Sequence, residues 1–290
     1  MSFTWDINPE IFRFGSLAVR YYGLFFVGVF LGGFYFLRWQ MMRVGWTEED
    51  VSDFIIPGML AVIIGARLGH VFFYDWSFYS ANPVEIIKFW RGGLASHGAT
   101  IGLVVSLFYY AKKKGMAFAE VTDRFSFSAA LGATLVRIGN FFNSEIVGRV
   151  TDQNWGVRFP RCIEDRGKAL IPLRHPSQLY EAIMGAVIIL ILVIVDRIYK
   201  EKRPRGILGA LFLSLYFTGR FIVEFFKEFQ TGLREEHVLT MGQFLSIPLA
   251  VFGYIWLYVA IKNNKPAKSV DPIKLRQAKA KNKKNKKKGK

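Results

Sequence analysis

Long apolar runs separated by short polar segments extend from about residue 19 to residue 261. A transmembrane α-helix needs about 20 mostly apolar residues, and the chain has seven runs of about that length. They cover residues 19–37, 54–74, 94–111, 125–142, 179–198, 208–226 and 239–261. The fifth run contains the uninterrupted apolar stretch AIMGAVIILILVIV, whereas charged, histidine and asparagine side chains fall within the second, third and fourth. This pattern predicts an all-α, polytopic membrane protein with seven transmembrane helices.

The composition excludes an ordinary soluble protein. Hydrophobic residues make up 52% of the 290 residues and aromatic residues 16%, and the mean hydropathy is +0.23 despite a lysine-rich end. A soluble domain of this size cannot bury so much apolar surface. The one cysteine, Cys162, excludes an internal disulfide framework and any cysteine-based zinc site.

Most of the net charge of +17 belongs to the last segment of the chain. Residues 262–290 contain 12 Lys and one Arg against one Asp. We therefore expect a transmembrane domain over residues 1–261 and a lysine-rich, disordered tail over residues 262–290. The body is not basic enough to predict nucleic-acid binding. The tail either fixes the topology or binds anionic headgroups of membrane lipids.

The distribution of basic residues predicts the orientation in the membrane. The short loops after the first, third and fifth predicted spans are denser in Lys and Arg than the longer loops on the other side. The positive-inside rule then places the N-terminus outside and the C-terminus, with its lysine tail, in the cytoplasm. Residues 1–12 lack a basic segment of the signal-peptide type, so we expect the first span to be retained.

Ionisable side chains inside predicted spans are the first functional signal, because a charge at membrane depth costs at least about 2.5 kcal/mol. Arg67, His70 and Tyr74 share one face of the second span. A functional site and a structural polar seam between helices explain these three residues equally well. His97 stands among small residues at the start of the third span, which leaves room for a ligand.

The fourth and sixth spans carry the densest polar groups. The fourth ends in a polar run whose candidate site residues are Arg137, Asn140, Asn143, Glu145 and Gly148. The sixth places Tyr216, Arg220 and Glu224 at successive four-residue steps on one face. An arginine binds phosphate through two parallel charge-assisted hydrogen bonds. The alternatives are a structural polar cluster in the fourth span and, in the sixth, an Arg220–Glu224 pair that neutralises itself.

These polar groups cluster toward the outer ends of the predicted spans. Several arginines around one cavity indicate an anionic ligand, and the apolar surroundings indicate an amphiphile such as a phospholipid. A transporter or flippase for an anionic lipid would use the same arginines. It would normally show internal repeats and a site at the midplane, and the sequence shows neither. A seven-helix receptor or scaffold gives this cluster no purpose.

The segment 137–148 closely resembles the signature of the bacterial prolipoprotein diacylglyceryl transferases. The resemblance extends, in the expected order, over residues 15–260. It includes Tyr22-Gly23, Gly65-Ala66-Arg67, Ser96-His97-Gly98, the RHPSQLYE run at 174–181 and the Tyr216–Arg220 and Glu224 segment. Val136 stands where the family usually has glycine, which could tighten helix packing locally. The lysine tail lies outside the resemblance.

The resemblance implies a transferase of the bacterial inner (plasma) membrane, with its active site toward the periplasm. Residues 1–261 would be the catalytic domain, and residues 143–178 a periplasmic loop region. The family transfers the sn-1,2-diacylglyceryl group of phosphatidylglycerol to the lipobox cysteine thiol of preprolipoproteins. This lipidation forms a thioether, releases glycerol-1-phosphate and is the first step of lipoprotein maturation. No metal or organic cofactor is implied, and the reactive thiol belongs to the substrate.

The resemblance also implies roles for individual residues. Arg137 and Arg220 would hold the phosphate, and Asn140 and Glu145 would order that site. Tyr22 and Tyr216 would position headgroup or ester oxygens. We expect Gly98, Asn143, Gly148 and Glu224 among the substrate-binding residues. His97 is the candidate base for the thiol. A positioning role for His97, with the thiolate activated by arginine, is the alternative.

Overall fold

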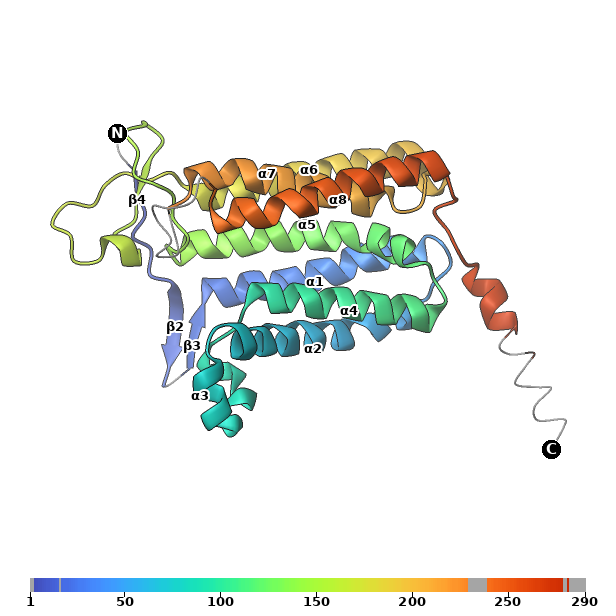
Figure 1. The fold of residues 1–290 in the computed structure, drawn as a ribbon, viewed down its shortest axis with the longest axis horizontal. Helices are drawn as coiled ribbons and strands as arrows, with labels where there is room; N and C mark the ends of the chain where they lie inside the picture. The colour runs from blue at the N-terminus through green and yellow to red at the C-terminus, as the bar shows by residue number, and fades with distance from the viewer. Residues whose placement is uncertain (1–2, 16, 229–238, 279–280, 282–290) are drawn as a thin grey trace. The chain divides into compact units, whose positions relative to one another are not determined.

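Helices make up most of the structure, a computed structural model that describes residues 3–15, 17–228, 239–278 and 281 (Figure 1). The long helices are α1 (Tyr21–Met42), α2 (Glu48–Phe73), α4 (Ser96–Lys114), α5 (Phe118–Phe142), α6 (Ser177–Tyr199), α7 (Ile207–Val223) and α8 (Met241–Asn263). The short elements are the strands β1 (Phe3–Thr4), β2 (Glu10–Phe14), β3 (Leu17–Arg20) and β4 (Val157–Arg158), the helix α3 (Trp76–Ala81) and the 3-10 helices η1 (Pro83–Ile87), η2 (Phe89–Arg91), η3 (Ile163–Asp165), η4 (Lys200–Lys202) and η5 (Glu224–Phe226). The prediction of a mostly helical chain is confirmed.

Six helices of the described chain are long and apolar enough to cross a membrane, namely α1, α2, α5, α6, α7 and α8. They coincide with six of the seven predicted spans and confirm a multi-pass membrane protein. The third predicted span coincides with α4, which is not in that set. Lys112, Lys113 and Lys114 fill the last turn of α4 and lower its hydropathy. The seventh span and the orientation of the termini therefore stay predictions.

The chain divides into two compact units. The first comprises Met1–Phe36 and Asp123–Ala267, and the second comprises Leu37–Thr122 and Lys268–Lys290. The strands all belong to the first unit, where β2 pairs antiparallel with β3 and β1 pairs parallel with β4. Two of the three boundaries fall within α1 and α5, where the sequence shows only continuous apolar runs and therefore no sign of the division.

Small residues allow the helices of the first unit to pack closely. In this unit α7 contacts both α6 and α8 (Figure 1). A Cβ atom added to Gly253 of α8 would lie 2.6 Å from the backbone nitrogen of Ser214 on α7. A Cβ added to Gly185 of α6 would strike Thr134 of α5. Close backbone approach at small residues is the usual basis of helix association in lipid, where the hydrophobic effect between helices is weak.

A buried carboxylate fixes the start of α7, the helix that carries Arg220. Asp123 of α5 is 1% exposed and accepts hydrogen bonds from three backbone N–H groups. The donors are Gly206 at 2.6 Å, Leu208 at 2.9 Å and Gly209 at 3.0 Å. These groups have no partner within the helix itself, and the helix dipole favours a negative charge there. Asp123 thus sets the position of α7 relative to α5 inside the first unit.

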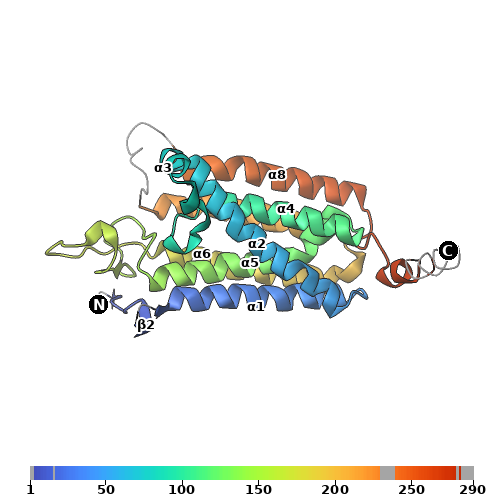
Figure 2. The same cartoon turned by 90° about the horizontal axis from the view of Figure 1, so that it is seen from below.

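The second unit is built on close packing of α2 against α4 (Figure 2). Gly98 of α4 lies so near Gly65 that an added Cβ would collide with the Gly65 carbonyl oxygen. The Cα atom of Gly69 would be 2.9 Å from the same Cβ. Gly98 therefore has a packing reason to be glycine, besides the substrate-binding role predicted for it.

Arg67 of α2 holds the loop that precedes α4 and is almost completely buried. Its guanidinium donates to the carbonyl oxygens of Glu85 at 2.6 Å, Ile86 at 2.8 Å and Gly92 at 2.5 Å. The polar face of the second predicted span has a structural and a functional interpretation. These contacts support the structural interpretation for Arg67. The side chain orders the segment that leads into His97.

The described part of the tail makes specific contacts, which differs from the disorder expected for residues 262–290. The Ser269 backbone N–H donates to Glu120 at 2.7 Å, and the Ser269 hydroxyl donates to the same carboxylate. Arg276 donates to Asp50 at 2.8 Å. Composition did not reveal these contacts because they depend on single polar residues spaced among lysines. Residues 279–280 and 282–290, which hold most of the lysines, lie outside the described residues.

Replacing Asp123 by alanine removes the acceptor of three backbone N–H groups. We expect the free energy of unfolding to fall by about 2 kcal/mol, measured as a lower thermal midpoint in detergent. Asp75→Ala is the matched control, because Asp75 precedes α3 without a side-chain capping bond. Equal midpoints for the two variants would contradict the role of Asp123.

Candidate active site

A buried carboxylate lies among the cationic side chains of the first unit. Glu181, on the second turn of α6, is 1% exposed. Its Oε2 atom lies 2.7 Å from Nε of Arg137 on α5 and 3.7 Å from Nη1 of Arg220 on α7. Its Oε1 atom lies 2.7 Å from Nζ of Lys227, directly after η5. Three segments of the chain thus converge on one carboxylate.

Charge balance explains why these groups are together. A buried charge without a partner costs several kcal/mol, so Glu181 and its cations stabilise one another. Lys227 also lies 3.3 Å from Glu224. Among the groups joined by these ion pairs, three cations face two carboxylates, which is an excess of one positive charge. The Arg220 side chain, 27% exposed, is the most accessible of the three cations and presents this charge to its surroundings.

A hydrogen-bonded amide connects Arg137 to a third carboxylate, that of Glu145, which lies outside these ion pairs. Arg137 donates to Oδ1 of Asn140 at 3.3 Å, and Asn140 donates to Oε1 of Glu145 at 2.8 Å. Asn143 donates to the same oxygen at 3.2 Å. The structure therefore brings together four of the polar residues predicted in the fourth span. Glu145 is held by amides, whereas Glu181 is the carboxylate that holds the arginines.

The turn after α5 gives this network its shape. Ser144 and Ile146 have φ values of 53° and 57°, a left-handed conformation that is strained for a β-branched residue such as Ile146. The first residues of α6 hold the turn in place. Ser177 donates to the Ile146 carbonyl at 3.0 Å, and Gln178 donates to the Glu145 carbonyl at 2.8 Å. The start of α6 thus supports the predicted signature directly.

Two tyrosines predicted from the resemblance lie beside the same network. Tyr216 on α7 lies beside Arg137. Tyr22 on α1 lies beside Asn140. A Cβ atom added to Gly139 would be 2.7 Å from the Tyr22 ring, so this glycine allows the ring to reach the site. Both phenols are therefore within reach of a ligand held by Arg137.

Gly148 lies where three segments meet. Its backbone N–H donates to the His175 carbonyl at 3.0 Å. An added Cβ atom would come 2.6 Å from both the His175 Cβ and the Phe226 carbonyl oxygen. Any larger residue would separate the loop from the start of α6 and the end of η5. The contacts of this glycine in the structure are therefore packing contacts, and its predicted role in substrate binding remains an expectation.

His97 belongs to the second unit and is described with it. It is the second residue of α4, is exposed, and follows the loop that Arg67 orders. The first unit contains the other predicted site residues apart from Gly98, namely Tyr22, Arg137, Asn140, Asn143, Glu145, Gly148, Tyr216, Arg220 and Glu224. The structure brings these first-unit residues into one region, while His97 and Gly98 share the start of one helix.

From the sequence, Glu181 stands only at the end of the 174–181 run that carries the resemblance, and neither it nor Lys227 has an assigned role. The signal for Glu181 was present, because a carboxylate stands near the start of the fifth predicted span. Its partners lie 44, 39 and 46 positions away, on other segments, and no periodic pattern connects them. Gln178 was missed for the same reason. Among the described residues no group of three His, Cys, Asp or Glu side chains is arranged to hold a metal ion.

The loop between α5 and α6 contains a separate buried ion pair. Arg174 donates to both oxygens of Asp165, at 2.6 and 2.8 Å, and thereby holds the pKa of that carboxyl well below its usual range. Burial raises the pKa of the neighbouring Cys162 thiol to about 11. At neutral pH this thiol is protonated and a poor nucleophile.

Replacing Glu181 by glutamine keeps the side-chain shape and removes the central anion. We expect the free energy of unfolding to fall by about 3 kcal/mol, because three cations then face one another. Inorganic phosphate should restore part of the thermal midpoint in detergent, since it supplies an anion. Glu49→Gln, at an exposed position, is the control and should show neither effect. A Glu181→Gln variant that matches the wild type, with and without phosphate, would contradict this account.

Known proteins are similar to this chain over most of its length. The family model described as prolipoprotein diacylglyceryl transferase matches residues 9–259. A relative named phosphatidylglycerol–prolipoprotein diacylglyceryl transferase from Chloroherpeton thalassium is 38% identical, over 89% of this chain and 94% of the relative. Relatives of the same name from Pseudoalteromonas atlantica and Vibrio cholerae are 38% and 40% identical, over 95% and 87% of this chain and 97% and 92% of theirs. The chain therefore belongs to the prolipoprotein diacylglyceryl transferase family, a family of bacterial membrane-bound transferases.

Proposed function

We propose that this protein transfers the sn-1,2-diacylglyceryl group of phosphatidylglycerol to the lipobox cysteine of a preprolipoprotein, the first step of lipoprotein maturation. The names of its relatives contain both substrates, phosphatidylglycerol and a prolipoprotein. The single observation that carries the proposal is the convergence of Arg137, Arg220 and Lys227, with one excess positive charge, at a buried site. A phosphodiester carries one negative charge and fits this excess.

The proposed reaction exchanges one bond for another. The cysteine sulfur attacks the sn-3 carbon of the diacylglyceryl group, so a C–S bond forms and the bond from that carbon to the phosphate oxygen breaks. The electron pair of the broken bond leaves with the phosphate as glycerol-1-phosphate, and the thiol gives up its proton. Negative charge grows on the phosphate as the bond breaks. Fixed cations therefore stabilise the transition state more than the bound substrate.

The contacts within the first unit suit this lipid headgroup. Glu181 and Asn140 fix the orientation of Arg137, which leaves the more accessible Arg220 to complete the phosphate clamp. The side-chain oxygens Oδ1 of Asn143 and Oε1 of Gln178 are buried and lack a hydrogen-bond donor among the described residues. Buried acceptors are normally satisfied. The two free hydroxyl groups of the phosphatidylglycerol headgroup are donors of the required kind.

The thiol needs help to ionise, because a free cysteine has a pKa of about 8.5. We assign this task to His97, which is exposed at the start of α4 beside small residues. The phenols of Tyr22 and Tyr216 then position headgroup or ester oxygens. The alternative is a thiolate stabilised by the arginines alone, with His97 as a hydrogen-bonding group.

The topology follows from the same proposal. We propose that α4 is the seventh span, that the N-terminus lies outside, and that the C-terminal tail lies in the cytoplasm. The protein then resides in the bacterial inner membrane with residues 143–178 on the periplasmic side. Residues 1–261 are the catalytic domain, and the tail is dispensable for the chemistry. The basic loops after the predicted first, third and fifth spans support this orientation.

Reconstitution tests the activity. The protein in detergent is mixed with phosphatidylglycerol and a lipobox peptide that contains one cysteine. We expect a diacylglyceryl mass gain on the peptide, an equal amount of released glycerol phosphate, and no reaction with a cysteine-to-serine peptide. Folded, lipid-binding protein that yields neither product would instead indicate a lipid-binding or lipid-moving protein.

The phosphate role predicts the behaviour of arginine variants. We expect Arg220→Ala to lower kcat/KM for phosphatidylglycerol by at least about 100-fold, because the growing phosphate charge loses a cation. Arg220→Lys should recover only part of the rate, since it keeps the charge without the planar fork. Arg166→Ala, at an exposed loop position, is the control. Wild-type turnover and lipid affinity in Arg220→Ala would refute the phosphate role.

The base role predicts a change in pH dependence. A histidine must be neutral to accept the thiol proton, so the rate should fall on the acidic side of the profile. We expect His97→Asn to slow the reaction by about 100-fold or more and to abolish that acidic limb. His97→Asn with a near-normal rate and an unchanged pH–rate profile would favour the arginine-stabilised thiolate.

A further inference from the structure

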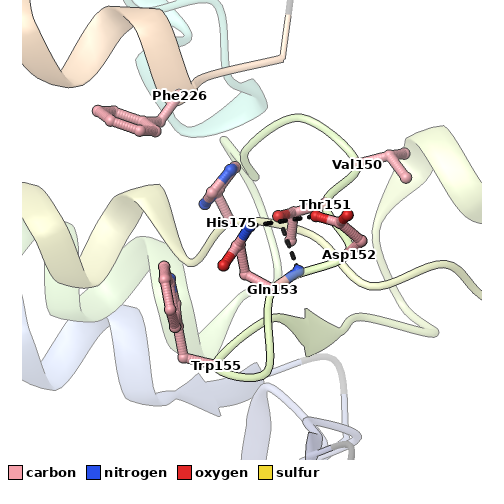
Figure 3. Close-up of a pocket in the computed structure, with 7 residues that line it drawn as sticks. All are labelled: Val150, Thr151, Asp152, Gln153, Trp155, His175 and Phe226. Atoms are coloured by element: carbon pink, nitrogen blue, oxygen red, sulfur yellow. Dashed lines mark hydrogen bonds between the residues drawn. The ribbon is translucent and has the colours of Figure 1, made fainter.

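An open hollow of about 760 Å³ lies between the loop that joins α5 to α6 and the end of η5 (Figure 3). Its lining combines the aromatic groups Trp155, His175 and Phe226 with the polar residues Thr151, Asp152 and Gln153. The mixture of aromatic faces and hydrogen-bonding groups is typical of sites for organic ligands or peptides. None of the residues assigned above to the phosphate site lines it.

Tyr180 links two of the aromatic residues of the hollow through hydrogen bonds. The Trp155 indole N–H donates to the Tyr180 hydroxyl at 2.9 Å. The same hydroxyl lies 3.1 Å from Nδ1 of His175. The His175 and Phe226 rings meet edge to face, with centroids 5.2 Å apart. The loop region, the start of α6 and η5 therefore form one preorganised wall.

This network also assigns the proton of the histidine ring. Because the Tyr180 oxygen accepts from Trp155, its own hydrogen is available for Nδ1 of His175. In the tautomer in which Tyr180 donates to Nδ1, the ring N–H belongs to Nε2. Burial lowers the pKa of His175, so the ring is neutral at neutral pH. A neutral ring with an N–H donor at Nε2 suits a peptide carbonyl oxygen.

Short covalent and hydrogen-bonded links connect the hollow with the cations around Glu181. Tyr180 directly precedes Glu181, and Phe226 directly precedes Lys227. Arg149 joins the two sides, because its backbone N–H donates to the Phe226 carbonyl and its Nε donates to the Lys227 carbonyl, both at 2.9 Å. Residues that line or support the hollow are therefore joined directly to residues of the ion-paired cluster.

We propose that this hollow holds the polypeptide segment that follows the acceptor cysteine of the protein substrate. The inference rests on the proposed function. The apolar signal segment before the cysteine remains among lipid, whereas the chain after it is hydrophilic and leaves toward water. Trp155 and Phe226 offer faces to its side chains, and His175 donates to its backbone. Asp152 carries the negative charge of the lining and favours neutral or basic side chains over acidic ones.

Two peptides separate docking from chemistry. The short peptide ends as an amide at the lipobox cysteine, and the long peptide continues for about eight hydrophilic residues, enough to span about 26 Å when extended. We expect the wild-type protein to modify both, with a lower KM for the long peptide. Trp155→Ala should raise the KM of the long peptide about tenfold, which is about 1.4 kcal/mol. Its kcat and the KM values of the short peptide and of phosphatidylglycerol should stay unchanged.

Leu170→Ala is the matched control, because Leu170 is 80% exposed in the same loop region and does not line the hollow. Asp152→Asn, a substitution at an exposed position, provides the second test. Long peptides with three acidic residues after the cysteine should have a higher KM than those with three lysines, and Asp152→Asn should narrow this difference.

Each outcome decides between the two proposals. If the wild-type protein modifies neither peptide, the proposed function is wrong. Equal KM values for the short and long peptides in the wild-type protein would overturn the docking site while the function stands. A Trp155→Ala variant that impairs both peptides equally, together with no charge effect of Asp152→Asn, would mean that Trp155 has a structural role only.

Discussion

The structure of the site depends on the neutralisation of one buried carboxylate. Glu181 is almost completely withdrawn from solvent, and only the approach of Arg137, Arg220 and Lys227 makes its charge tolerable. The same attraction holds three cations together, which would otherwise repel one another. The ends of α5 and η5, the last turn of α7 and the second turn of α6 therefore have to meet. Among the ion-paired groups one positive charge is left over, and we propose that this charge binds an anion.

The rest of the first unit brings those helix ends to the right place. Asp123 fixes the start of α7, and small residues such as Gly185 and Gly253 allow the helices to approach closely. Gly148 lets the loop after α5 touch both α6 and the end of η5. The charge pairing and the helix packing therefore support one another. In the second unit, Arg67 donates hydrogen bonds to loop carbonyl groups and thereby fixes the segment before His97.

The sequence predicted the helices well because apolar runs of membrane length are a strong signal. It also predicted the network of Arg137, Asn140 and Glu145, which lie close together in the chain. The long-range partners were harder to find. Glu181 and Lys227 meet from segments 46 positions apart, and no local pattern encodes that contact. The charge pattern of the sequence does not predict that Arg67 binds carbonyl groups of a loop. It also does not predict that Ser269 and Arg276 hold part of the lysine-rich tail in place.

The central claim is that the cations around Glu181 receive the phosphate of the lipid donor. The most direct measurement is a cryo-electron microscopy structure of the protein in a lipid nanodisc that contains phosphatidylglycerol. The account predicts headgroup density with the phosphate in hydrogen-bonding contact with the guanidinium groups of Arg137 and Arg220, and with Glu181 still beside them. A phosphate bound elsewhere, with both arginines still paired only to protein carboxylates, would contradict it.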